Sequence, residues 1–111
     1  MIGLERRAAT SYSVGMVYDA LTDEALIERV DGRDAAALSA LYDRYARQAH
    51  AVALLVTHEP NAAAAVVEEL FWQIWQRGAP PFPGATFRNA LMLSARRLAE
   101  RMAQPQMATP T

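Results

Sequence analysis

The sequence predicts an all-α fold, a compact bundle of three to four helices, and three observations support this. Alanine and leucine dominate a composition that is 52% hydrophobic and 21% charged, which is typical of a globular chain rather than a disordered one. Glycine and proline are confined to a few breaks between longer segments. Within those segments, apolar residues recur at the i, i+3, i+4, i+7 spacing of a helix face. With 111 residues the chain can form one domain with a modest core.

The predicted domain covers residues 22–103 and is flanked by two segments without a clear pattern. Residues 1–21 are interpreted as a flexible N-terminal arm, with a helical stretch at its end around residues 14–21. Residues 104–111 contain two prolines and are interpreted as a disordered tail.

The first two predicted helices have clear start and stop signals. Thr22 is a good N-cap, and the two carboxylates that follow it favour the start of a helix. This helix is expected to end at Gly32, the residue type that most often follows a helix. Asp34 caps the second helix, which continues to about Thr57. Its predicted apolar face consists of Leu38, Leu41, Tyr42, Tyr45, Ala49, Val52 and Val56.

The third predicted helix, residues 62–77, follows a break at residues 58–61 and carries the most informative pattern of the chain. Its predicted apolar arc consists of Val67, Leu70, Phe71, Ile74 and Trp75, and its polar face of Glu69, Gln73 and Gln76. Trp72 lies at the border between the two faces. A tryptophan within a rim of polar groups is typical of a binding hot spot. The alternative is that Trp72 only covers a neighbouring helix, and the sequence leaves both interpretations open.

The segment Gly78–Gly84 contains three prolines and cannot be helical, because proline lacks the amide hydrogen. Thr86 is expected to cap the last helix. The predicted buried stripe of that helix consists of Phe87, Leu91, Ala95, Leu98 and Met102. Charge divides along the chain: residues 1–77 carry seven arginines against eleven acids, whereas residues 78–111 carry four arginines against one acid. Opposed charge on two parts of one small domain can steer different partners to different faces.

No pattern indicates an enzyme, a cofactor or a metal ion. The chain has no cysteine, so disulfides and thiolate metal ligands are excluded. His50 and His58 lack a third ligand at a metal-binding spacing. There is no nucleophile elbow and no glycine-rich phosphate loop. No apolar run approaches the roughly 20 residues of a membrane span, so we expect a cytoplasmic protein with no membrane contact.

Three segments together resemble region 2 of the sigma-70 family of RNA polymerase sigma factors, in particular the extracytoplasmic-function type. Residues 23–30 read Asp-Glu-Ala-Leu-Ile-Glu-Arg-Val, and residues 32–45 continue with Gly-Arg-Asp-Ala-Ala-Ala-Leu-Ser-Ala-Leu-Tyr-Asp-Arg-Tyr. Residues 66–75 read Val-Val-Glu-Glu-Leu-Phe-Trp-Gln-Ile-Trp and are similar to the family's polymerase-docking helix. The Phe-Arg and Ala-Arg pairs that begin at residues 87 and 95 are similar to its promoter-reading helix. The resemblance covers residues 22–102, which is region 2 without region 4.

The resemblance implies a transcription-initiation domain with two binding surfaces. One would dock on the clamp helices of the polymerase β′ subunit, and the matching residues are Glu68, Glu69, Trp72 and Gln73. The other would contact the promoter −10 element, where the family captures flipped bases and holds phosphates with basic side chains. The residues available for this DNA contact are Phe82, Phe87, Arg88, Arg96 and Arg97. An anti-sigma factor or a separate region-4 chain is a further candidate partner.

Departures from the family pattern support an alternative function. Ala65 stands where many members have an acid, and Asn89-Ala90 lacks the tryptophan common after the Phe-Arg pair. The loop Gly78–Gly84 is short, rich in proline and uncharged. These features favour a sigma-like protein-interaction module that does not itself read DNA. The sequence fits a fragment, one half of a split sigma factor and a stand-alone relative equally well.

Overall fold

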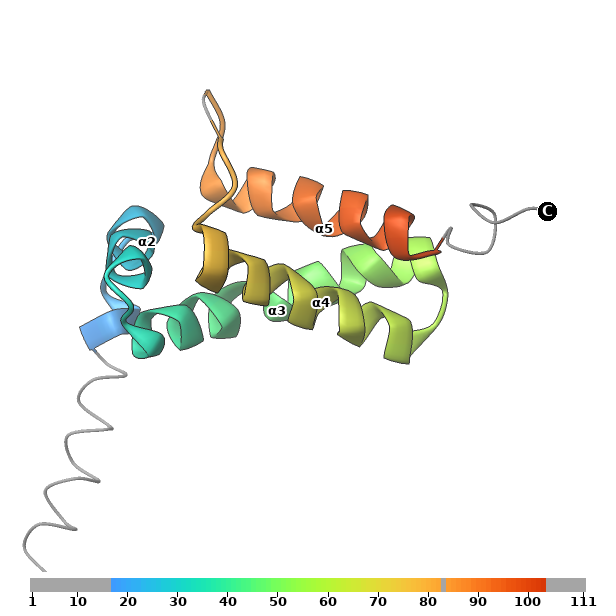
Figure 1. Cartoon of the computed structure of the whole chain (residues 1–111), viewed down its shortest axis with the longest axis horizontal. Coiled ribbons are helices and arrows are strands. Elements are labelled where there is room, and N and C mark those ends of the chain that lie inside the picture. Colours follow the sequence, from blue (N-terminus) through green and yellow to red (C-terminus); the bar gives the residue numbers. More distant parts are fainter. Residues whose placement is uncertain (1–16, 83, 104–111) are drawn as a thin grey trace, which may run out of the picture.

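The computed structural model describes residues 17–82 and 84–103, and four long helices make up most of this part of the chain (Figure 1). They are α2 (Asp23–Asp31), α3 (Ala35–Thr57), α4 (Pro60–Arg77) and α5 (Phe87–Ala103). Helices α3, α4 and α5 pack side by side, and α2 lies across one end of this bundle, beside the first turns of α3 (Figure 1). The all-α bundle that the sequence predicts is confirmed.

Local capping signals determine where the helices begin and end. The Thr22 side chain accepts a hydrogen bond from the backbone of Ala25, and Asp34 accepts two from the first turn of α3. The Thr86 hydroxyl accepts one from the backbone of Asn89 in the first turn of α5. These three caps are as the sequence predicts, because a cap depends only on residues within one turn.

Helix α4 begins at Pro60, two residues before the start predicted from the sequence. The predicted break was placed at this proline. Proline is well tolerated in the first turn, however, where its missing amide hydrogen would have no partner in the helix. The Glu59 carboxylate caps α4 by accepting from the amide of Ala62 at 2.7 Å. At the other end α4 stops at Gly78, whose φ of 90° favours glycine over any other residue.

One continuous core lies between the helices. Its large, fully buried side chains include Leu26 from α2, Leu41 from α3, Val66 and Ile74 from α4, and Phe87 and Leu91 from α5. Many of the remaining core positions are alanines, which let the helix backbones approach closely: Ala37, Ala49, Ala53, Ala63, Ala95 and Ala99.

Three sequence predictions need correction. Met102 was assigned to the buried stripe of α5 but is 40% exposed, since the core on this helix ends with Leu98 and Ala99. Tyr42 was placed on the buried face of α3 but is exposed, because its neighbour Leu41 occupies the core position. Residues 17–21 were assigned to a flexible arm, whereas their side chains Tyr18 and Leu21 pack against the core. The rest of the predicted arm and the predicted tail lie outside the described residues.

Candidate functional site

The predicted polymerase-docking residues all lie on the outward side of α4, but on two flanks of it. Trp72 is 53% exposed and lies beside the exposed Glu68, on the flank that faces α3. Glu69 and Gln73 are half-buried and lie one turn apart, with the Gln73 amide donating to the Glu69 carboxylate at 3.1 Å. Gln73 also lines a cleft of about 240 Å³ between α4 and the loop that follows it.

Trp72 borders an open apolar groove between α3 and α4, which we call the tryptophan groove. It has a volume of about 340 Å³ and is lined by Ala35, Leu38, Tyr42, Glu68, Phe71, Trp72 and Trp75. The Tyr42 ring meets the Phe71 ring edge-on, with 5.1 Å between the centroids. The sequence analysis had assigned Leu38 and Tyr42 to the core and therefore missed their part in this surface.

Arg33 fixes one edge of the tryptophan groove. Its guanidinium lies over the Trp75 ring, 5.2 Å from the centroid, and donates to the Trp75 carbonyl at 2.5 Å. That carbonyl belongs to the last turn of α4, where a cation is favoured by the helix dipole. The contact joins residues 42 positions apart, so no local pattern could reveal it. Arg33 therefore contacts both the ring and the backbone of Trp75, one of the residues that line the groove.

A second groove, which we call the loop groove, lies between the loop after α4 and the outer side of α5. Its volume is about 340 Å³, and it brings together two of the predicted DNA-contacting residues, Phe82 and Arg97. The Phe82 ring is half-buried and meets Phe87 edge-on at 5.9 Å. Its other lining residues are Pro80, Pro81, Ala85, Asn89, Ala90, Leu93 and Ser94.

Phe87 was predicted to contact DNA, but its side chain has no exposed surface. Its ring lies between Tyr45 and Phe82, with both ring centroids 5.9 Å away and both pairs edge-to-face. In this conformation no base can reach the ring. We therefore assign Phe87 to the core rather than to the nucleic-acid contact.

Arg88 and Arg96 lie on a different side of α5 from Arg97. The Arg88 Nε donates to the Gln48 side chain of α3 at 3.1 Å, and the Arg96 Nε pairs with Glu100 at 3.3 Å. Arg96 lines a third groove, between α3 and α5, whereas Arg97 lines the loop groove. The five residues predicted to form one DNA-contacting surface thus divide between two sides of α5 and the core.

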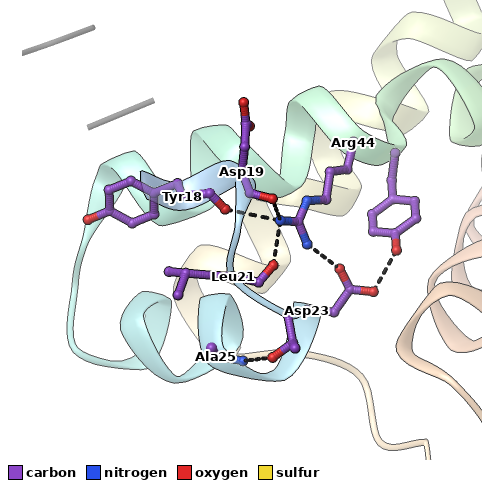
Figure 2. A network of polar contacts seen from close by, with 8 residues as sticks. Tyr18, Asp19, Leu21, Asp23, Ala25 and Arg44 are labelled. Atoms are coloured by element: carbon purple, nitrogen blue, oxygen red, sulfur yellow. Dashed lines mark hydrogen bonds and ion pairs between the residues drawn. The ribbon is translucent and has the colours of Figure 1, made fainter. Parts of the chain in front are cut away.

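A polar cluster anchors the N-terminal end of the described chain to α3 (Figure 2). The Arg44 guanidinium donates to the backbone carbonyls of Tyr18, Asp19 and Leu21 and pairs with the Asp23 carboxylate at 2.8 Å. The Tyr45 hydroxyl donates to the same carboxylate at 2.5 Å. Burial, together with this bond, raises the pKa of Tyr45 to about 12. The Tyr45 ring also packs on Phe87, the first residue of α5. The cluster therefore connects the start of α2 to the start of α5.

A second contact holds the same segment at the start of α3. The Tyr18 hydroxyl donates to the Asp34 carboxylate, and this bond holds the pKa of that carboxyl below its usual range. Arg29 lies 5.5 Å from the centroid of the Tyr18 ring. The cap of α3 is therefore tied to the chain that precedes α2.

Neither a metal site nor a membrane-crossing helix is found in the described part of the chain. Within residues 17–82 and 84–103, no three histidine or carboxylate side chains come together in a way that could hold a metal ion. None of the helices there is both long and apolar enough to cross a membrane.

Comparison with known proteins gives one informative similarity. The chain is 27% identical over 88 residues to the ECF RNA polymerase sigma factor SigK of Mycolicibacterium vanbaalenii. The matched region covers 78% of this chain and 45% of that protein, so the chain spans less than half of the relative's length. No family model matches the chain, and no solved structure matches it. The similarity indicates a distant relationship to sigma-70 family factors.

Proposed function

We propose that this chain is a sigma-factor-like domain of transcription initiation with two binding surfaces. Helix α4 and the tryptophan groove would dock on the clamp helices of the RNA polymerase β′ subunit. The loop groove would receive a base of the promoter −10 element. The observation that carries the proposal is the half-exposed Trp72, set beside Glu68 on the helix where the sequence resembles the docking helix of sigma factors.

The docking half of the proposal rests on the chemistry of the tryptophan groove. A large aromatic ring beside an apolar groove is a common anchor for a partner helix. Glu68 at the groove margin and Glu69 on the other flank of α4 give this face negative charge. Complementary charge on a partner would speed association and fix the orientation of the complex. A basic helix with a protruding apolar side chain is therefore the partner that this surface fits best.

Binding to a purified polymerase fragment that carries the clamp helices tests this half. The double variant Glu68→Arg, Trp72→Ala should weaken binding by at least about 30-fold, since hot-spot truncation typically costs about 2 kcal/mol or more. Glu28→Arg, Leu54→Ala is the matched control, because it makes the same kinds of change at exposed positions on α2 and α3. Equal binding by the two double variants would refute the docking assignment.

The DNA half rests on Phe82 and Arg97, which line the same groove. An aromatic ring gives an extruded base a stacking surface, and an arginine beside it neutralises a phosphate. Arg97 has no hydrogen-bond or ion-pair partner among the residues described here, unlike Arg88 and Arg96. Arg101 of α5 also has no such partner, but Arg97 is the one of the two that lines the loop groove.

Salt titrations with single-stranded −10 DNA test this half. Arg97→Ala should reduce the slope of log Kobs against log salt by about 0.7, the value for one phosphate contact on a single strand. Phe82→Leu keeps an apolar side chain against Phe87 but removes the stacking surface, so binding should fall without unfolding. Arg47→Ala, an exposed arginine of α3, is the control. A slope that falls equally for Arg47 and Arg97 would refute a specific site.

Two observations favour a second candidate, a sigma-like protein-interaction module that binds an anti-sigma factor or the polymerase without reading DNA. Arg97 is the sole charged residue that lines the loop groove, and Phe87 is unavailable to a base. The two candidates differ in one result. An interaction module would bind the polymerase fragment through Trp72. Its binding to single-stranded DNA would not change in Phe82→Leu or Arg97→Ala.

A further inference from the structure

A further groove lies between α3 and α5, and we call it the aliphatic groove; it adjoins the loop groove at Leu93, which lines both. It has a volume of about 550 Å³ and is lined by Val52, Leu55, Val56, Met92, Leu93 and Arg96. Both leucines of this lining are exposed to solvent, Leu55 to 77% and Leu93 to 46%. A single exposed leucine is ordinary, but two that flank one apolar groove indicate a binding surface.

The charged residues of α5 near the aliphatic groove are two arginines, Arg88 and Arg96, and one carboxylate, Glu100. Arg88, Met92 and Arg96 follow one another at i, i+4, i+8, so the two arginines lie on the side of α5 that carries the groove. Arg96 is the single charged residue in the lining, and its side chain is 65% exposed. Its partner is Glu100 on the same helix, and an exposed pair of this kind contributes little to stability. A carboxylate from another molecule could therefore replace Glu100 at small cost.

We propose that the aliphatic groove binds an amphipathic helix of a protein partner, which places leucine-like side chains between Leu55 and Leu93 and a carboxylate against Arg96. Apolar anchors at i, i+3 or i+4, and i+7 are the usual way in which a helix fills such a groove. Nucleic acid fits less well, because the lining offers no aromatic ring for a base. The site is separate from the tryptophan groove and does not depend on the proposed function.

Met92 offers a direct reporter for this site. The full chain, labelled with ¹³C at the methionine methyl groups, would be titrated with two synthetic helical peptides. Both peptides carry leucines at i, i+4 and i+7. Beside the leucines, one peptide carries glutamate and the other carries lysine, and the two peptides are otherwise identical. The Met92 methyl signal, assigned with Met92→Leu, should shift and saturate with the glutamate peptide. The Met102 signal serves as the internal control, since Met102 lies outside the groove lining.

Two substitutions separate the apolar contribution from the charged one. Leu55→Ser alters a largely exposed side chain, so the fold is retained while the affinity for the glutamate peptide falls at least tenfold. Arg96→Glu should reverse the preference, so that the lysine peptide binds more tightly than the glutamate peptide. Trp72→Ala, a truncation on α4 outside the aliphatic groove, should leave the affinity for the glutamate peptide unchanged.

Three outcomes would overturn the inference. The first is an unmoved Met92 signal with the glutamate peptide at about 1 mM, the weak limit of a specific contact. The second is an unchanged preference between the peptides after Arg96→Glu. The third is that single-stranded DNA, rather than either peptide, shifts Met92, which would make this side of α5 a nucleic-acid contact. Each outcome is independent of the polymerase assay, because none involves Trp72.

Discussion

The assignment of Phe87 to the core leads to a prediction that distinguishes it from a DNA-contacting residue. Phe87→Ala removes a fully buried ring from the point where α5, the loop after α4 and the middle of α3 meet. We expect this change to destabilise the whole domain. A residue whose main role is to stack on a base would instead lower DNA affinity and leave stability almost intact.

The magnitude follows from the burial and the two aromatic contacts. Truncating a buried phenylalanine to alanine costs about 3–5 kcal/mol, including the cavity that remains. The edge-to-face contacts with Tyr45 and Phe82 place Phe87 toward the upper part of this range, since each such pair contributes about 0.5–1.5 kcal/mol beyond its buried area. A domain of this size unfolds with a total of about 5–15 kcal/mol, so the variant should lose a large share of its free energy of unfolding.

Urea unfolding followed by the fluorescence of Trp72 and Trp75 would measure the effect. Phe87→Leu is the matched control and should cost clearly less than Phe87→Ala, because it retains most of the apolar volume and leaves a smaller cavity. Phe82→Ala should also cost clearly less than Phe87→Ala, because Phe82 is only half-buried. A loss below about 1 kcal/mol for Phe87→Ala, with weakened DNA binding, would refute the core assignment.

Three further predictions concern the contacts that hold the helix ends. The pKa of Tyr45 is raised to about 12. The Tyr45 hydroxyl therefore stabilises the fold fully below pH ~10, the ordinary tyrosine value, and this contribution is lost as the pH rises toward 12. Alkaline unfolding, monitored by circular dichroism, should therefore be less pronounced in Tyr45→Phe than in the unmodified chain. The pKa of Asp34 is lowered. The Asp34 carboxylate therefore stabilises the fold above pH ~3.9, and this contribution is lost as the pH falls through the folded pKa. In Asp34→Ala the free energy of unfolding should fall less steeply with acid, and an unchanged pH dependence would contradict this role of Asp34. Arg33 has a φ of 69°, a conformation that glycine tolerates better than other residues. In urea unfolding, Arg33→Gly should therefore be more stable than Arg33→Ala by about 1 kcal/mol. Equal stability of the two variants would contradict this reasoning.

The sequence predicts the helices well because their signals are local. The caps at Thr22, Asp34 and Thr86 act within one turn, and the apolar period of α4 identifies four of its buried side chains. It also predicts that Trp72 lies at the edge of the apolar arc. The structure finds this ring half-exposed beside α3, so the two interpretations of Trp72 are not exclusive.

The surfaces could not be predicted in the same way, because each groove is formed by residues from two segments. Arg96 and Arg97 both lie off the buried stripe, but successive helix residues point about 100° apart. One therefore faces α3 and the other faces the loop. The resemblance to the promoter-reading helix of sigma factors placed both on one DNA-contacting surface. Only the packing of α5 against its neighbours shows that they belong to different grooves.

The two flanks of α4 would bring the proposed docking surface and the proposed DNA contact close together on this small domain. Gln73, on the flank opposite Trp72, lines a cleft together with Pro80 and Pro81. The same two prolines also line the loop groove that contains Arg97. A partner that covers α4 would therefore touch the proline wall of the loop groove. Because these prolines have fixed φ angles, such a contact would hold the wall in place rather than reshape it. In this arrangement the polymerase would stabilise a preformed groove, and the aliphatic groove on the α3 side of α5 would remain open to a different partner.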